Sequence, residues 1–278
     1  MRRQLSFPCE DATLYATLDL PDSGEATTGL LLISGGNEIR SGAHAGQAQL
    51  AAALAKSGYA VFRYDRRGVG DSSGDNQGFL SSEPDLAAAL HCFRAQVPKL
   101  AKIAGFGNCD AATALMLFHE RLGLDALILA NPWTFESDQA EDDLPPPQAI
   151  RSRYLDRLKD PKALKRLVTG DVDLSKLAKG LKRASKGDPN LPTPFAQRLG
   201  AALASSTIPV TILLAEQDRT AQQFIAEWEG AAFAACHDHP DICVERLASG
   251  SHSFADAAAK QWLEDQLIAK LDSLSRSP

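Results

Sequence analysis

The sequence predicts an α/β fold in which helices flank a mostly parallel central sheet and a helical insertion interrupts the chain. Along the first half, short apolar runs of strand length alternate with longer helical patterns, the order of strand–helix–strand units. These runs are largely apolar, as strands covered on both faces are. The alternation stops after Pro132 and resumes at Ile208, and 278 residues are enough for one large domain with such an insertion.

The expected elements of the first half form an antiparallel pair, followed by alternating strands and helices. The pair covers residues 5–7 and 14–20. Further strands are expected over residues 29–34, 59–64, 102–106 and 126–130, joined by helices over residues 45–56, 84–95 and 111–121.

After the insertion, the sequence predicts two more strands, each followed by a helix. The strands cover residues 209–214 and 242–247, and the helices cover residues 221–235 and 254–271. We therefore predict a core made of residues 1–133 and 206–278, with residues 134–205 as a helical lid.

The predicted insertion is locally basic. Residues 151–186 contain 12 lysines and arginines against 4 aspartates and glutamates. Leucines recur there at helical spacing, which predicts two amphipathic helices with a basic outer face, lying over the site as a lid. Such a face could attract an acidic partner such as an acyl carrier protein, an anionic glycan or an anionic membrane surface, or it could simply be solvated.

Composition excludes several classes of protein. Acidic residues outnumber basic ones by 35 to 29, which argues against a nucleic-acid binder. No run approaches the ~20 apolar residues of a transmembrane segment, and no apolar stretch of a signal peptide follows Met1. The five cysteines show neither metal-type nor disulfide-framework spacing. We therefore expect a soluble cytoplasmic protein without structural disulfides.

The strongest local motif covers residues 105–112, where a buried strand passes into a helix through small residues on both sides of Cys109. A nucleophile elbow needs this pattern, because bulky residues two positions before and after the nucleophile would clash at the strained turn. Gly107 and Ala111 occupy those positions. The helix N-terminus favours a thiolate, whereas the Asp110 carboxylate opposes it. The alternative is that Cys109 is merely a small buried residue.

A nucleophile of this type needs a base and an orienting acid, in the chain order nucleophile, acid, histidine. Asp218 follows a predicted strand at the place where the acid belongs, and Glu216 is its nearby rival. His252 lies in a Gly/Ser-rich loop after the last predicted strand. Either residue alone could be an ordinary loop residue, but the ordered set predicts a Cys109–His252–Asp218 triad.

The loop over residues 34–44 predicts the second half of an oxyanion hole. One amide is expected from Asp110, which follows the nucleophile, and the other from Asn37 in this glycine-rich loop. Gly36, Arg40 and His44 lie beside it and are candidates to line the pocket. The alternative is a plain glycine turn between strand and helix.

Two further motifs resemble binding sites without matching them. Residues 65–74 are glycine-rich but lack the spacing and the lysine of a phosphate-binding loop, so we interpret them as a loop that braces the elbow through ion pairs. Cys236-His237-Asp238-His239 has too few ligands at suitable spacing for zinc. We expect neither a metal nor an organic cofactor.

Together these motifs resemble the α/β-hydrolase superfamily across nearly the whole chain. The resemblance rests on the glycine loop, the Asp-x-Arg-Gly-x-Gly-x-Ser motif of residues 65–72, the elbow and the Asp218/His252 pair. More narrowly, the sequence resembles the exosortase A system-associated hydrolase 1 family in residues 35–44, the Gly-x-Cys-Asp-Ala elbow, Asn131-Pro132-Trp133 and the stretch from Tyr154-Leu155 through residues 170–174. That family usually carries a proline where Asn37 stands, so Asn37 is assigned from its backbone position alone.

The narrower resemblance implies a link to exosortase and exopolysaccharide systems of Gram-negative bacteria, but it supplies no substrate. The residues favour cleavage of an ester or thioester through an acyl-enzyme. Three alternatives stay open: an acyltransferase, a lactonase, and a noncatalytic binding partner that retains the fold. Neither the motifs nor the resemblance separates ester from thioester from lactone.

Overall fold

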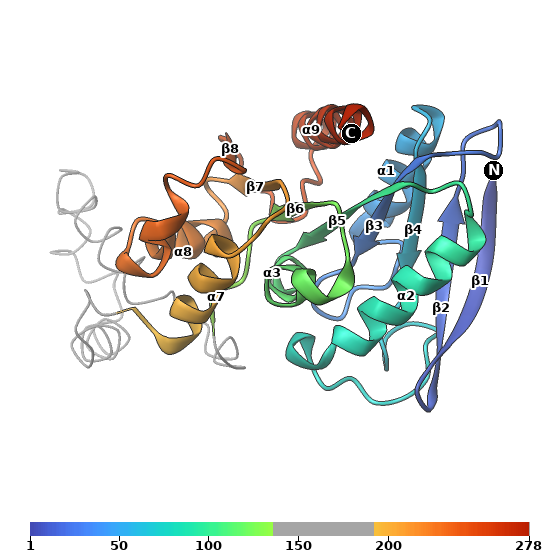
Figure 1. Ribbon diagram of the computed structural model, residues 1–278, viewed down its shortest axis with the longest axis horizontal. Coiled ribbons are helices and arrows are strands. Elements are labelled where there is room, and N and C mark those ends of the chain that lie inside the picture. The colour runs from blue at the N-terminus through green and yellow to red at the C-terminus, as the bar shows by residue number, and fades with distance from the viewer. Residues whose placement is uncertain (136–191, 278) are drawn as a thin grey trace, which may run out of the picture.

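The computed structural model describes residues 1–135 and 192–277, and it confirms the predicted α/β fold (Figure 1). Within these residues the sheet has eight strands in the order β1-β2-β4-β3-β5-β6-β7-β8. β2 runs antiparallel to β1 and β4, and the remaining neighbours are parallel. The strands are β1 (Arg2–Cys9), β2 (Ala12–Asp19), β3 (Thr28–Ile33), β4 (Ala60–Tyr64), β5 (Lys102–Asn108), β6 (Ala126–Ala130), β7 (Val210–Ala215) and β8 (Ile242–Leu247).

Helices cover both faces of the sheet. One face packs against α2 (Glu83–Gln96), α3 (Asp110–Leu122), α7 (Pro194–Ala204) and α8 (Arg219–Trp228), and the other against α1 (Gly46–Lys56) and α9 (Ala257–Arg276). Successive strand residues contribute to opposite cores: Leu31 belongs to the α2–α3 side, and Leu30 and Leu32 belong to the α1–α9 side. This alternation explains why the central strands are apolar throughout.

Two predicted helices differ from the observed ones. The expected helix over residues 221–235 is divided into α8 and the 3-10 helix η4 (Ala231–Cys236). Gly230 stands at the break in an extended conformation, and glycine is a poor residue for continuing a helix. The closing helix begins later than predicted because Asp256 caps it, its side chain accepting the Ala259 N–H at 2.9 Å.

Only part of the predicted lid lies among the described residues. The basic stretch over residues 151–186 lies outside them. α7, which falls inside the predicted range 134–205, packs against α3 and η4, and its buried Phe195, Leu199 and Leu203 belong to the α2–α3 core. This helix is therefore packed into the body of the described fold, and the division of the chain at residues 133 and 206 stays a prediction.

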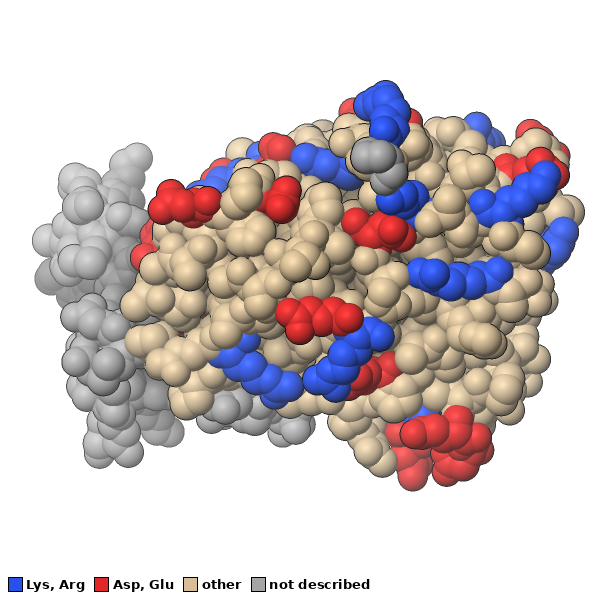
Figure 2. All heavy atoms as spheres, in the orientation of Figure 1, with Lys and Arg blue, Asp and Glu red and all other residues tan. Residues whose placement is uncertain are grey.

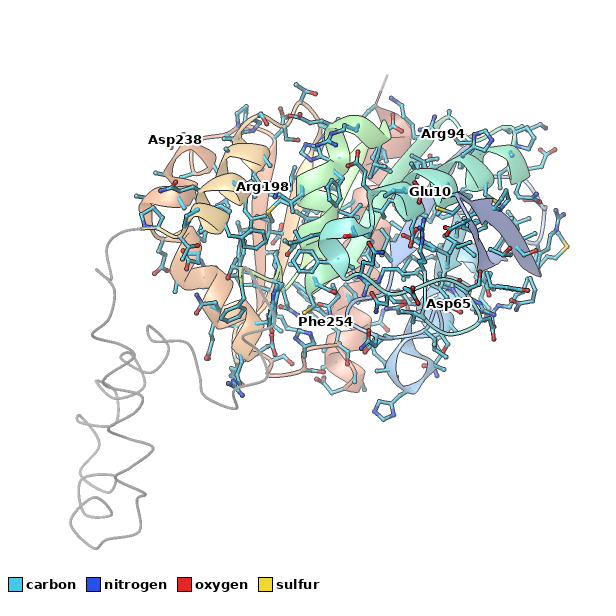
Figure 3. All side chains as sticks on the ribbon, turned by 90° about the horizontal axis from the view of Figure 1, so that it is seen from below. Glu10, Asp65, Arg94, Arg198, Asp238 and Phe254 are labelled. Carbon is cyan, nitrogen blue, oxygen red and sulfur yellow. The ribbon has the colours of Figure 1, made fainter. Side chains whose placement is uncertain are left out.

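The parallel strands end at a common edge, and that edge carries the candidate site. Figure 3 separates the two edges: Asp65 and Phe254, which follow the ends of β4 and β8, lie low in the view, whereas Arg94 and Asp238, which precede β5 and β8, lie at the top. Carboxyl ends of parallel strands are where α/β sheets bind ligands. Residues that follow β3, β5, β7 and β8 therefore meet there.

The described surface carries charges of both signs. On the face shown in Figure 2, basic and acidic side chains are interspersed over the tan surface, without a continuous patch of one sign. Among the described residues, none of the helices has the length and apolar character needed to cross a bilayer.

The contact between α7 and η4 gives a test of the fold. A Cβ added at Gly200 would lie 1.9 Å from the Ala232 carbonyl oxygen. Alanine normally stabilises a helix relative to glycine, but here we expect Gly200→Ala to lower the free energy of unfolding by about 1–3 kcal/mol through overpacking. Urea denaturation measures the change.

Gly46→Ala is the matched control, because Gly46 has helical backbone angles and an added Cβ meets nothing within 4 Å. It should leave stability unchanged or raise it. Equal effects of the two substitutions would contradict the packing of α7 described above.

Candidate active site

Cys109 occupies a strained turn between β5 and α3. Its backbone angles are φ 60° and ψ −126°, a conformation that non-glycine residues rarely adopt. The Cys109 N–H donates to the Ala130 carbonyl at 3.0 Å, and the Cys109 carbonyl accepts from the Trp133 N–H at 3.2 Å. A Cβ at Gly107 would lie 2.6 Å from the backbone of Ala111, so the small residue predicted there is required. The predicted elbow geometry is present.

Asp218 is fixed by the N-terminus of α8. Its Oδ2 accepts the N–H groups of Thr220 and Ala221, each at 3.0 Å, and so caps the helix. Burial raises the pKa of Asp218, but the hydrogen bond and charge of His252, together with these amides, outweigh burial and hold the pKa below its usual value. The carboxylate is thus held in its ionised form beside His252, and the α8 amides fix its position.

His252 joins the other two candidate residues. Its Nδ1 lies 3.0 Å from Asp218 Oδ2, and its imidazole lies near enough to the Cys109 thiol for the two groups to interact. The interactions with Asp218 and Cys109 raise the pKa of His252 to about 10, against the opposing effect of burial. The rival acid Glu216 pairs instead with Arg246 at 3.5 Å. The structure therefore brings the three residues predicted as a triad together, with His252 bonded to Asp218 and close to Cys109.

Two asparagines that the motif analysis gave no role hold the His252 loop. Asn108 Nδ2 and Asn131 Nδ2 both donate to the His252 carbonyl, at 3.1 and 3.0 Å. Asn131 is fully buried, has φ 40°, and accepts the Ala215 N–H at 2.9 Å through Oδ1. It thus ties the end of β7 to the histidine loop. Its sequence signals were its position directly after a buried strand and its place in the Asn131-Pro132-Trp133 motif.

The glycine loop lies against the elbow. A Cβ at Gly35 would come within 2.5 Å of the Asn108 carbonyl oxygen, so this approach requires glycine. The Gly36 N–H donates to Asp110 Oδ1 at 2.6 Å. Within the described residues the Asn37 N–H meets no acceptor, and its side chain accepts from Asn76 Nδ2 at 2.8 Å. The Asp110 N–H belongs to the first turn of α3, where amides lack helical partners.

Arg40 and His44 lie away from the triad. Arg40 forms ion pairs with Asp65 and with Asp71, the latter at 2.8 Å, and it lines a separate cavity of about 240 Å³ beside Arg63. His44 is exposed in the short 3-10 helix η1 (Ala43–Ala45). No contact given by the described residues joins either side chain to Cys109.

A cavity of about 140 Å³ adjoins the site on the α1–α9 side of the sheet. Asn108 and Ser253, the chain neighbours of Cys109 and His252, form part of its wall. Leu50, Phe106 and Phe254 make it partly apolar. This cavity lies next to the candidate nucleophile, although neither Cys109 nor His252 lines it.

The Cys236–His239 run does not converge on one point. His237 Nε2 contacts the Trp228 carbonyl at 2.8 Å, His239 Nδ1 accepts the Asp241 N–H at 3.2 Å, and buried Cys236 contacts the Gly200 carbonyl. Among the residues with described side chains, no cluster of three or more His, Cys, Asp or Glu could hold a metal ion. All five cysteines are described, and each is a free thiol.

Comparisons with known proteins agree with the observed fold. A family model described as the alpha/beta hydrolase family matches residues 30–265. No match was found among curated protein sequences. Solved structures with a similar fold are the esterase Pf2001 of Pyrococcus furiosus (16% identity, TM-score 0.63, 98% of this chain and 91% of that one) and Est1E of Butyrivibrio proteoclasticus with ferulic acid bound (15%, 0.62, 98% and 100%). Another is XC6422 of Xanthomonas campestris, an α/β serine hydrolase without a lid (16%, 0.55, 99% and 94%).

The asparagine network gives the first test of this site. Asn131→Ala leaves the Ala215 amide without its partner and removes a bond to the His252 carbonyl. We expect the free energy of unfolding to fall by about 1–3 kcal/mol and alkylation of Cys109 to slow. Asn76→Ala, which removes two exposed bonds, one to the Asn37 side chain and one from the Gly78 N–H, is the control and should change stability by less than about 0.5 kcal/mol.

The raised pKa of His252 gives the second test. A group whose pKa rises on folding contributes stability below its unfolded pKa of about 6.5, and this contribution is lost as the pH rises through its folded pKa of about 10. The stability difference between wild type and His252→Gln should therefore be largest at pH 6 and shrink toward pH 10. Urea midpoints at several pH values measure it, and a difference independent of pH would contradict the pairing.

Proposed function

The chain belongs to the alpha/beta hydrolase family, and from that membership we propose that it cleaves an ester or thioester with Cys109 as nucleophile, His252 as general base and acid, and Asp218 as the orienting carboxylate. One observation carries this proposal: His252 Nδ1 pairs with Asp218 Oδ2 at 3.0 Å, and the same imidazole lies close enough to Cys109 for that thiol to raise its pKa. A nucleophile within reach of a base that is itself held by a third group is the arrangement that covalent acyl transfer requires.

The first half of the proposed reaction forms an acyl-enzyme. His252 takes the proton of the Cys109 thiol, and the resulting thiolate attacks the carbonyl carbon. The amides of Asp110 and Asn37 stabilise the resulting oxyanion, and the leaving alcohol or thiol takes its proton from His252. Asp218 keeps Nδ1 of the imidazole as the proton-bearing nitrogen, so that Nε2 serves the reacting groups.

The second half releases the product. His252, now neutral, removes a proton from water, and the hydroxide attacks the thioester carbonyl. The second tetrahedral intermediate collapses to a carboxylic acid, and the Cys109 sulfur leaves and takes back a proton from His252. Apart from the substrate and water, every group that takes part in these steps belongs to the chain.

Acyl transfer is the second candidate function, and it is favoured by the identity of the nucleophile. A cysteine forms a thioester intermediate, which is a competent acyl donor to alcohols and amines as well as to water. XC6422 is described as a serine hydrolase, whereas the elbow here carries Cys109. Product analysis in the presence of an added alcohol separates hydrolysis from transfer.

The biological setting is proposed from sequence resemblance. Residues 35–44, the elbow and Asn131-Pro132-Trp133 support a role beside exosortase and exopolysaccharide systems, in the cytoplasm. The basic stretch of residues 151–186 supports an acidic partner or an anionic surface.

The test is alkylation of the native protein by iodoacetamide at pH 6 to 9, with each cysteine followed by mass spectrometry. Burial raises the pKa of Cys9, Cys92 and Cys236, the last to about 11, so these thiols should react slowly. Cys109 should react fastest and stay reactive at pH 6. His252→Ala should slow it at least ~10-fold, while His44→Ala should not.

Turnover of p-nitrophenyl acetate completes the test. We expect Cys109→Ala and His252→Ala to abolish it and Glu216→Ala to leave it unchanged. If Cys109 reacts no faster than Cys9 or Cys236, the activated nucleophile is wrong, and a noncatalytic binding role becomes the better account.

A further inference from the structure

The Asp110 carboxylate and the Arg66 guanidinium grip one residue of the glycine loop from two sides. Asp110 Oδ1 accepts the Gly36 N–H at 2.6 Å, and Arg66 Nη2 donates to the Gly36 carbonyl. Asp110 Oδ2 lies 3.3 Å from both Nη1 and Nη2 of Arg66, which closes the ring of contacts. The Asp110 and Arg66 side chains are only 15% and 6% exposed, so their ion pair is largely shielded from water, whereas the bond from the Gly36 N–H lies at an exposed part of the loop.

We call these contacts among Asp110, Arg66 and Gly36 the clamp. They leave the next amide of the loop without an acceptor in the described part of the chain. The carboxylate already uses the Gly36 N–H, whereas the Asn37 N–H has no acceptor among the described residues. The loop backbone is also pressed against the elbow, because a Cβ at Gly35 would lie 3.3 Å from Cys109 Cβ and 2.9 Å from Asp110 Oδ1. Asn37 is two residues further along this loop, and its amide is the candidate donor to an oxyanion formed at Cys109.

Arg66 also offsets the negative charge of Asp110 beside Cys109. An unpaired carboxylate adjacent to Cys109 would repel both a thiolate and a developing oxyanion. The guanidinium contacts that carboxylate, so the pair is close to neutral at the place where negative charge would appear. Arg66 comes from the loop after β4, which the sequence analysis interpreted as a brace for the elbow.

We infer that Asp110 and Arg66 are positioning residues, which hold the glycine loop so that the Asn37 amide faces the oxyanion. This inference rests on the proposed function. It predicts that loss of the clamp impairs reactions that pass through an oxyanion and spares reactions of the thiol that do not. Alkylation by iodoacetamide occurs at a saturated carbon and forms no oxyanion, so it serves as the internal comparison.

The experiment compares Asp110→Ala with Asp85→Ala. Asp85 is a matched control, because its carboxylate likewise accepts a backbone N–H, that of Arg67 at 2.8 Å, and pairs with the Arg67 guanidinium at 3.1 Å. Its contacts reach neither the glycine loop nor the elbow. For each variant, kcat and KM for p-nitrophenyl acetate are measured beside the rate of Cys109 alkylation. Amide hydrogen exchange is measured over residues 35–41.

We expect Asp110→Ala to lower kcat by about 10²-fold, as misplaced oxyanion donors do, with little change in KM. Its Cys109 alkylation should be as fast as in wild type or faster, because a neighbouring negative charge is removed. Exchange over residues 35–41 should rise. Asp85→Ala should change neither the ratio of turnover to alkylation nor the exchange. If Asp110→Ala does not fold, Asp110→Asn, which preserves size and one acceptor oxygen, is tested by the same ratio.

The outcomes separate the two levels of inference. Normal kcat and normal exchange in Asp110→Ala, or an equal loss of turnover and alkylation, would overturn the clamp and leave the triad intact. Absence of Cys109-dependent turnover in the wild type would overturn the proposed function and, with it, the catalytic role of the clamp.

Discussion

A single cysteine held at a positive φ angle is the constraint on which the rest of the site depends. Such backbone strain costs on the order of 1–3 kcal/mol and persists only where the surroundings fix it. Here β5 fixes the chain before Cys109 and α3 fixes it afterwards, while the Cys109 carbonyl receives the Trp133 N–H. Glycines at positions 35 and 107 leave room for the turn. The sheet therefore determines where the thiol stands before any catalytic partner is considered.

Two carboxylates near this thiol have different environments, and the difference suits them to different tasks. Asp218 is held by the amides at the start of α8 and faces His252, so its charge is directed at the imidazole. Asp110 is turned toward Arg66 and Gly36, so its charge is offset where a negative charge nearby would be harmful. The two side chains are chemically identical. Their surroundings, namely the helix amides around Asp218 and the guanidinium beside Asp110, therefore determine the role of each carboxylate.

The strands and the ordered set of Cys109, Asp218 and His252 were predictable from sequence because each has a local pattern. Apolar runs mark strands, and small residues around Cys109 mark the elbow.

The asparagine network was not predictable, since Asn131 meets Ala215 and His252 only through the pairing of β6 with β7. The contact of Asp110 with Gly36 likewise depends on the pairing of β3 with β5. The break between α8 and η4 at Gly230 could have been predicted from the sequence, because glycine breaks helices.

The place of Asn131 has a consequence for the order in which the protein is made. The elbow, the glycine loop and Arg66 all belong to the part of the chain that leaves the ribosome first, before β7 and β8 are made. The partners of the Asn131 side chain, the Ala215 N–H and the His252 carbonyl, come later in the chain. The N-terminal part thus holds the candidate thiol without the histidine and aspartate with which it is proposed to act. The proposed triad is therefore complete only after the last two strands have been synthesised.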